Sequence, residues 1–246
     1  MTVGVSAGPQ EIVEVDGVEC LFEPRPWSFA EHHAAAIAAH WAEALQRKPK
    51  MFDGRVLLMH RGAVEIDAER GRVFRGAYLE TSFSAFLYWR DIGLPPAGVR
   101  NGFGMACLSS ADGAFVLGEM GPHTANAGAI YFASGTPDLS DIRDGQVDIE
   151  GSVRRELGEE TGLDPAMVQF DPGMTLVMDA SRVGFMKRVR SPEPAKALVA
   201  RIDAFLAQDP EPELARMHVI RQASEIGPRV QISAATYLRA TLAQVG

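Results

Sequence analysis

Three glutamates, Glu156, Glu159 and Glu160, stand close together in the segment RRELGEETGL, residues 154–163. On a helix they fall at i, i+3 and i+4, so their carboxylates share one face within one turn. Like charges at this spacing destabilise an isolated helix by a few tenths of a kcal/mol per pair. A bound cation would reverse that effect, and Mg²⁺ binds carboxylate oxygens that it bridges to phosphates. The spacing therefore predicts a divalent-metal site on this helix.

The neighbouring residues are suited to hold such a site in place. Arg155 lies four residues before Glu159, close enough on a helix to orient its carboxylate. Leu157 is expected to anchor the helix to a sheet, and Gly162 to end it in a left-handed cap. The simpler alternative is an acidic helix face exposed to water, which is commoner than a metal site.

The string Arg155–Leu163 resembles the second half of the signature of the Nudix hydrolases, G-x5-E-x7-R-E-U-x-E-E-x-G-U, where U is a bulky aliphatic residue. Every specified position of that half matches. The first half departs, because the signature expects Glu at position 147 and Gly at position 141, where this chain has Val147 and Asp141.

The segment YFASGTPD, residues 131–138, is similar to the strand and glycine turn that precede the family's helix. Gly135 would then be the glycine of that turn, and the loop to the helix would be about six residues longer than usual. The candidates to replace the missing glutamate are Asp144, Asp148 and Glu150.

The resemblance implies an α+β fold, a Nudix-like αβα sandwich with a mixed sheet, over residues 96–246. Residues 1–95 would form an N-terminal α/β extension that packs on the sandwich or helps to shape its pocket. The long loop and the extension together are similar to a UDP-glucose diphosphatase branch of the family.

The resemblance also implies a function and its residues. Members hydrolyse a nucleoside diphosphate linked to another group, with Mg²⁺ as cofactor and Mn²⁺ as a substitute. For this chain the expected substrate is a nucleotide sugar. The implied metal ligands are Glu159 and Glu160, then Glu156 and the carbonyl of Gly135. Arg155 would orient the carboxylates, so Arg155, Glu156, Glu159 and Glu160 are the candidate catalytic residues. The implied partner is a small-molecule nucleotide, and the family's many dimers allow a homodimer.

Two further groups are expected outside the motif. A general base would come from a late glutamate, and the candidates are Glu193, Glu211 and Glu213. Cations for the substrate phosphates would come from Arg100, Arg182, Lys187 and Arg188, each of which is otherwise a surface charge. The glycine-rich segment 118–129 matches no nucleotide-binding fingerprint and is expected as a loop at the mouth of the pocket.

Two alternatives stay open. One is a non-catalytic Nudix-fold module that binds or senses a nucleotide, because half of the signature is altered. The other is a globular α+β protein whose acidic helix is only surface. The three intact acids and their arginine favour the hydrolase, because loss of catalysis usually erodes them.

The composition bounds these readings. The chain has 246 residues, 46% of them apolar, and a net charge of −8, which disfavours binding to a nucleic-acid backbone. No apolar run is long enough to span a membrane, and the N-terminus does not resemble a signal peptide, so a soluble, cytoplasmic protein is expected. Cys20 and Cys107 are expected as buried free thiols.

Hydrophobic periodicity and turn residues predict the elements that must position the site. A helix is expected over 28–49, with a Ser28–Glu31 capping box and a stop at Pro49. Ser233 is expected to cap the closing helix. The other expected helices cover 82–93, 147–162, 193–209 and 233–245, and the expected strands cover 11–22 (a strand or a short hairpin), 55–62, 63–70, 71–80, 100–109, 114–121, 129–135, 174–190 (a pair) and 215–222, with a loop over 136–146.

Overall fold

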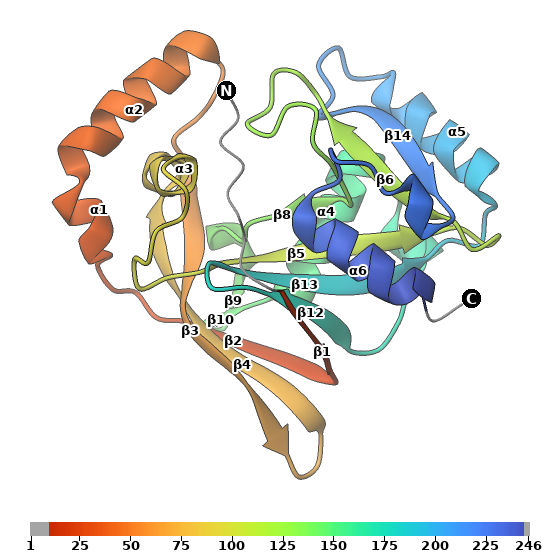
Figure 1. Ribbon diagram of the computed structural model, residues 1–246, viewed down its shortest axis with the longest axis horizontal. Helices are drawn as coiled ribbons and strands as arrows, with labels where there is room; N and C mark the ends of the chain where they lie inside the picture. The colour runs from red at the N-terminus through yellow and green to blue at the C-terminus, as the bar shows by residue number, and fades with distance from the viewer. Residues whose placement is uncertain (1–9, 244–246) are drawn as a thin grey trace.

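The computed structural model describes residues 10–243 and has an α+β fold with two sheets (Figure 1). The larger sheet runs in the order β1-β12-β13-β5-β6-β14, and three short strands, β7, β8 and β11, pair along it. Its strands are β1 (Glu11–Val15), β5 (Asn101–Ser109), β6 (Phe115–Met120), β7 (Ile130–Tyr131), β8 (Ser134–Gly135), β11 (Gln169–Phe170), β12 (Met174–Met178), β13 (Arg182–Arg190) and β14 (Leu214–Ile220).

The larger sheet is mixed, because β13 pairs with β5 in parallel while its other neighbours are antiparallel. Helices α4 (Ile149–Thr161) and α6 (Ile232–Ala243) lie behind and in front of it, and α5 (Ala195–Leu206) packs on α4 and β14 (Figure 1). Leu157 of α4 and Leu238 of α6 are both fully buried in the main apolar core. The expected mixed sheet between helical layers is confirmed.

The smaller sheet runs in the order β3-β4-β2-β10-β9, and helices α1, α2 and α3 lie beside it (Figure 1). A separate apolar cluster that includes Trp27, Leu58 and Trp89 joins these helices to it. The elements are β2 (Gly17–Phe22), β3 (Arg55–Asp67), β4 (Gly71–Ser82), β9 (Ile142–Arg143), β10 (Gln146–Val147), α1 (Ser28–His32), α2 (Ala34–Arg47) and α3 (Phe83–Asp91), and short 3₁₀ turns cover Leu139–Asp141, Pro165–Met167 and Ala223–Glu225.

Residues 11–22 form two strands that belong to different sheets, so the hairpin allowed by their sequence is not formed. β1 pairs with β12 in the larger sheet, and β2 pairs with β4 in the smaller one. Asp16 sits between them, and it both donates its N–H to the carbonyl of Arg72 and accepts the N–H of Arg72 on its carboxylate. The division of the chain into an N-terminal extension, residues 1–95, and a sandwich, residues 96–246, stays a prediction. Each of the two sheets contains strands from both of these segments.

Other predicted boundaries are corrected. The helix expected over 28–49 breaks at His33, and its N-cap is Trp27 in an extended conformation, so the Ser28 capping box is wrong. The two strands expected to meet in a turn at Gly62 form one continuous strand, β3. A Cβ at position 62 would collide with the ring of Phe74, so this glycine allows close packing and does not make a turn. The segment 136–146, expected as a loop, contributes the short strands β9 and β10.

The closing helix α6 begins one residue earlier than expected, and its cap is also different. The side-chain carbonyl of Gln231 accepts the backbone N–H groups of Ser233 and Ala234, at 2.9 and 3.1 Å. Ser233 itself is fully buried. Gln231 therefore satisfies the free donors of the first turn, where a serine cap was expected.

Both cysteines are buried free thiols, as expected. No helix within residues 10–243 is long and apolar enough to cross a membrane.

Candidate active site

Helix α4 is fixed at both ends, which determines where its acids point. Asp148 is the N-cap and accepts the N–H of Gly151 at 2.8 Å. Gly162 is the C-cap with φ of 67°, the left-handed conformation expected for it. Val153 and Leu157 are fully buried against the sheet. This orientation of the helix directs Glu156 and Glu160 toward the protein interior and Glu159 toward solvent.

Glu160 is the most deeply buried of the three acids, with 5% of its surface exposed. Its Oε1 accepts the backbone N–H of Ser134 at 3.1 Å, while its buried Oε2 has no hydrogen-bond partner within residues 10–243. Burial raises the pKa of Glu160 well above its usual range, and the negative charges of Glu156 and Glu213 add to the effect.

Glu156 lies against Gly135, where strand β8 approaches the helix. A Cβ at position 135 would collide with the carboxylate of Glu156, so only glycine permits this approach. Burial raises the pKa of Glu156 to about 7, although Arg155, with Nη1 at 3.0 Å from the carboxylate, opposes the shift. The structure therefore brings Glu156, Glu160 and Gly135 together.

Glu159 is exposed, and its carboxylate is held by Arg155 at 2.8 Å, the i, i+4 contact expected from the sequence. The guanidinium of Arg155 also contacts Asp141 at 3.1 Å, and Asp141 is only 4% exposed. Burial alone would lower the pKa of Arg155, but these carboxylates raise it above its usual value.

Asp141 thus binds the arginine, which the sequence did not indicate. The three acids considered as replacements for the missing glutamate have other places. Asp148 caps α4, and Glu150 pairs with Lys187 and Arg154 at 2.8 and 2.7 Å. Asp144 is exposed in a turn with φ of 50°. The sequence did not indicate this role of Asp141, because Asp141 occupies a position where the signature has glycine.

A cleft opens beside these acids and consists of two adjoining cavities of about 620 and 440 Å³. Glu160 and Glu213 line the larger cavity, and Glu156 and Glu213 line the smaller one. Both share the lining residues Phe83, Ala125, Asn126, Tyr131, Ser134 and Glu213. The segment expected at the pocket mouth is there, since residues 122–126 line the larger cavity.

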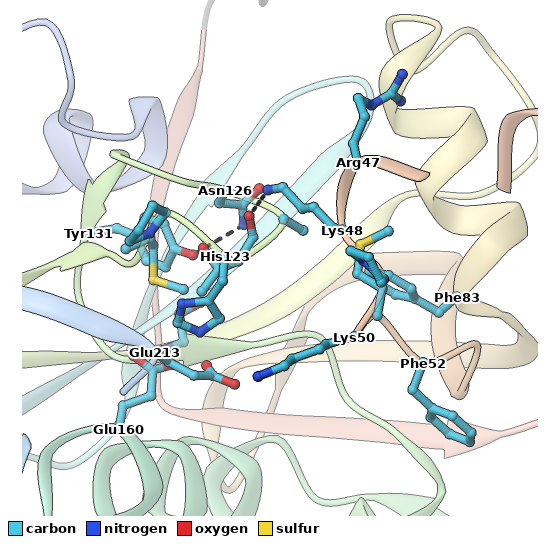
Figure 2. Close-up of a pocket in the computed structure, with 17 residues that line it drawn as sticks. Arg47, Lys48, Lys50, Phe52, Phe83, His123, Asn126, Tyr131, Glu160 and Glu213 are labelled. Carbon is cyan, nitrogen blue, oxygen red and sulfur yellow. Dashed lines mark hydrogen bonds between the residues drawn. The ribbon is translucent and has the colours of Figure 1, made fainter. Parts of the chain in front are cut away.

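Cations also line the cleft. Arg47 at the end of α2 and Lys48 and Lys50 in the loop that follows border the larger cavity, and Arg90 and Arg182 border the smaller one. Figure 2 shows Lys50 reaching into the pocket toward the two glutamates Glu160 and Glu213. The cleft therefore has an acidic wall and a basic wall, and the second comes mainly from the N-terminal part of the chain.

The candidates for a general base separate in the structure. Glu213 lines both cavities, whereas Glu193 pairs with Arg201 at 2.8 Å and Glu211 pairs with Lys50. Glu213 is thus the one of the three that borders the cleft.

The four basic residues proposed from the sequence also separate. Arg182 lines the cleft. The others are engaged elsewhere: Arg100 donates to the carbonyl of Gly62, Lys187 pairs with Glu150, and Arg188 lies over the ring of Phe115. Sequence reasoning missed Lys48 and Lys50, although the run RKPK at residues 47–50 carried the signal.

The acidic wall fits a hard divalent cation in its chemistry. Two buried carboxylates with raised pKa values and one unpartnered oxygen are a donor set that a cation would stabilise. Within the described part of the chain, however, no three acidic, histidine or cysteine side chains gather closely enough around one point to hold a metal ion. Glu159, turned to solvent, stays a predicted ligand.

No protein-family model and no curated protein matches the chain. Among solved structures, it is similar to a Nudix hydrolase from M. smegmatis, RenU, with 15% identity and a TM-score of 0.40 over 60% of this chain and 88% of that one. It is also similar to a Nudix hydrolase from Nitrosomonas europaea, with 19% identity and a TM-score of 0.30 over 59% and 84%. Scores this low carry no conclusion about the chemistry of this chain.

Proposed function

We propose that this chain is a Nudix-type, divalent-metal-dependent pyrophosphohydrolase that cleaves the diphosphate of a nucleoside diphosphate linked to another moiety. The observation that carries the proposal is the pair of largely buried carboxylates of Glu156 and Glu160 beside a cleft that basic side chains also line, with Oε2 of Glu160 left without a partner within residues 10–243. Buried carboxylates of this kind are costly for a fold and are typical of functional sites. The signature residues Arg155–Leu163 support the same reading.

Each residue would have a distinct part. Glu156 and Glu160 would hold the cation, with Glu159 and the carbonyl of Gly135 as further ligands. Arg155, fixed by Asp141, would keep Glu156 and Glu159 in place without touching the substrate. When bound, Mg²⁺, or Mn²⁺ in its place, would neutralise the diphosphate and lower the pKa of the attacking water. The carboxylate of Glu213 would accept the proton of that water.

A nucleotide sugar is the substrate class that we favour. The two adjoining cavities, of about 620 and 440 Å³, offer separate places for the two halves of a linked diphosphate. Met51, Met120 and Pro122 give the larger one an apolar lining, while Asn101, Thr136 and Gln231 give the smaller one polar side chains. Polar amides suit a sugar, and the weak sequence similarity to UDP-glucose diphosphatases points the same way.

The test is a phosphate-release assay, coupled to a phosphatase, on nucleotide sugars, dinucleoside polyphosphates, ADP-ribose and NADH, with and without Mg²⁺. The Glu156→Gln, Glu160→Gln double variant is measured beside the wild type. Metal-dependent turnover that disappears in the variant supports the proposal and selects the substrate class. Turnover that survives in the variant would place the chemistry elsewhere.

A nucleotide-binding module without catalysis is the second candidate. Two observations favour it: Val147 stands where the signature has glutamate, and no three acids gather at metal-ligand spacing within residues 10–243. A nucleotide sugar that binds at micromolar concentration but is not cleaved in Mg²⁺ or Mn²⁺ would select this candidate.

A further inference from the structure

The basic wall contains one cation that stands apart from the others. Four of its five cationic side chains have a carboxylate within ion-pair distance: Arg47 has Glu43, Lys50 has Glu211, Arg90 has Asp91 and Arg182 has Asp179. Lys48 has none among residues 10–243, and it lines the larger cavity. A cation that lines a cleft without a counter-charge is available to an anionic ligand.

Lys48 is also held in a fixed place. It is the C-cap of helix α2, with its backbone N–H bonded to the carbonyl of Ala44 at 2.9 Å. Its Nζ crosses to the loop at residues 121–126 and donates a hydrogen bond to the carbonyl of Thr124 (Figure 2). An ammonium group has three N–H donors, so this contact positions Lys48 and leaves donors for a ligand.

The surroundings of Lys48 are electropositive. Partial burial lowers its pKa, and the nearby guanidinium groups of Arg90 and Arg47 lower it further, while Asp91 offsets part of the effect. The attraction of an anion bound here would offset both the repulsion from the arginines and the cost of burying the ammonium. The same cavity has the apolar side chains of Met51 and Phe83 beside the lysine. A phosphate joined to a ring would contact both kinds of surface.

We propose that Lys48 forms an anion subsite that binds a phosphate group of a nucleotide and so sets its position against the acidic wall. The inference rests on the proposed function, because it places the nucleotide in the same cleft, and it adds a substrate-positioning residue outside the signature. Lys50 contributes less, since it is more exposed and already paired with Glu211. The N-terminal part of the chain would thus supply substrate recognition.

The experiment measures binding without catalysis, by calorimetry in a chelator, on the full chain. ADP, GDP, CDP and UDP are titrated beside the matching nucleosides, into wild type, Lys48→Met, Lys48→Arg and Lys196→Met. Lys196, which is exposed on helix α5 and does not line either cavity, is the matched control. Thermal melting verifies that each variant folds.

The expected result is that the tightest nucleoside diphosphate binds Lys48→Met about tenfold more weakly, because a charge-assisted hydrogen bond is lost. The affinity gap between nucleoside diphosphate and nucleoside narrows in that variant, and Lys48→Arg and Lys196→Met keep the gap. An unchanged gap in Lys48→Met, an equal loss for nucleoside and diphosphate, or no binding of any diphosphate to wild type each overturns the subsite.

The two proposals fail separately. If the gap narrows while wild type hydrolyses no linked diphosphate, the subsite stands and the hydrolase does not. If hydrolysis is found, Lys48→Met is expected to raise KM about tenfold with little change in kcat, as for loss of uniform binding. An unchanged KM with a reduced kcat would contradict a positioning role for Lys48.

Discussion

The two ends of helix α4 carry acids under opposite conditions. Near its start, Glu150 is bound by Lys187 and Arg154, whose hydrogen bonds lower its pKa although burial acts to raise it. Near its end, burial raises the pKa of both Glu156 and Glu160; Arg155 lies 3.0 Å from Glu156, whereas no basic side chain within residues 10–243 pairs with Glu160. The fold thus neutralises Glu150 with two cations at one end of the helix and leaves Glu160 without a cation at the other, within the described residues. Only the second condition suits a ligand site.

The largest expected effect comes from Glu160→Gln, which keeps the shape of the side chain and removes its carboxyl group. If Glu160 holds the cation, turnover falls about a thousandfold, equivalent to about 4 kcal/mol of lost transition-state stabilisation. The measurement is steady-state hydrolysis of the best substrate in saturating Mg²⁺. Glu150→Gln is the control on the same helix and should stay within about threefold of wild type. Equal losses of turnover in Glu160→Gln and Glu150→Gln would show that the two ends of the helix do not differ in their role in catalysis.

The next effect is on stability as a function of pH. The pKa of Glu156 is about 7 in the folded chain and 4.5 for an unperturbed glutamate, so the folded state binds more protons between these two pH values. The free energy of unfolding therefore falls as pH rises through this window, by about 3 kcal/mol from this group. Denaturant unfolding of wild type and Glu156→Gln from pH 4.5 to 8 without metal measures the difference between the two curves. Parallel curves would show that Glu156 titrates normally.

A smaller effect is expected at the neutralised end. Lys187 is buried, so Glu150→Gln leaves its ammonium without its carboxylate and should lower the free energy of unfolding by about 1–2 kcal/mol. Solvent weakens the effect because Glu150 is 41% exposed. Adding Lys187→Met to the variant should recover most of the loss. A double variant less stable than Glu150→Gln alone would speak against a simple ion pair.

The smallest effect is expected at Glu159, the exposed acid beside the buried pair. Its ion pair with Arg155 is solvent-accessible, so Glu159→Gln should change the free energy of unfolding by less than about 0.5 kcal/mol. Thermal melting without metal measures this. Turnover measured on the same variant then decides whether Glu159 is a metal ligand, because no stability change would mask the result.

The helix α4 and its cap could be predicted from local sequence because their causes are local. Gly162 ends the helix through its own backbone conformation, and Arg155 reaches Glu159 through helical spacing alone. The same reasoning located the glycine-rich loop at the pocket mouth. Where neighbours in sequence are also neighbours in space, pattern is sufficient.

The features that could not be predicted from the sequence depend on contacts between segments that are distant along the chain. Asp141 acquires its arginine through a 3₁₀ turn that pattern did not indicate, and Gly62 packs against Phe74 instead of turning. Lys48 reaches the cleft only because helix α2 ends beside a loop more than seventy residues later. No short window of sequence contains both partners of such a contact, so the sequence could show the basic run at residues 47–50 but not that it borders the cleft.

The position of strand β1 limits where the chain can be truncated. It is the outermost strand beside β12, and it satisfies the hydrogen-bonding groups along that flank of the larger sheet. A fragment that begins at residue 96 would present β12 as an open edge, a template for pairing with other copies. Such a fragment is expected to aggregate even with every acid of α4 in place, and a short peptide of residues 10–17, supplied separately, would be the natural agent to keep it dispersed.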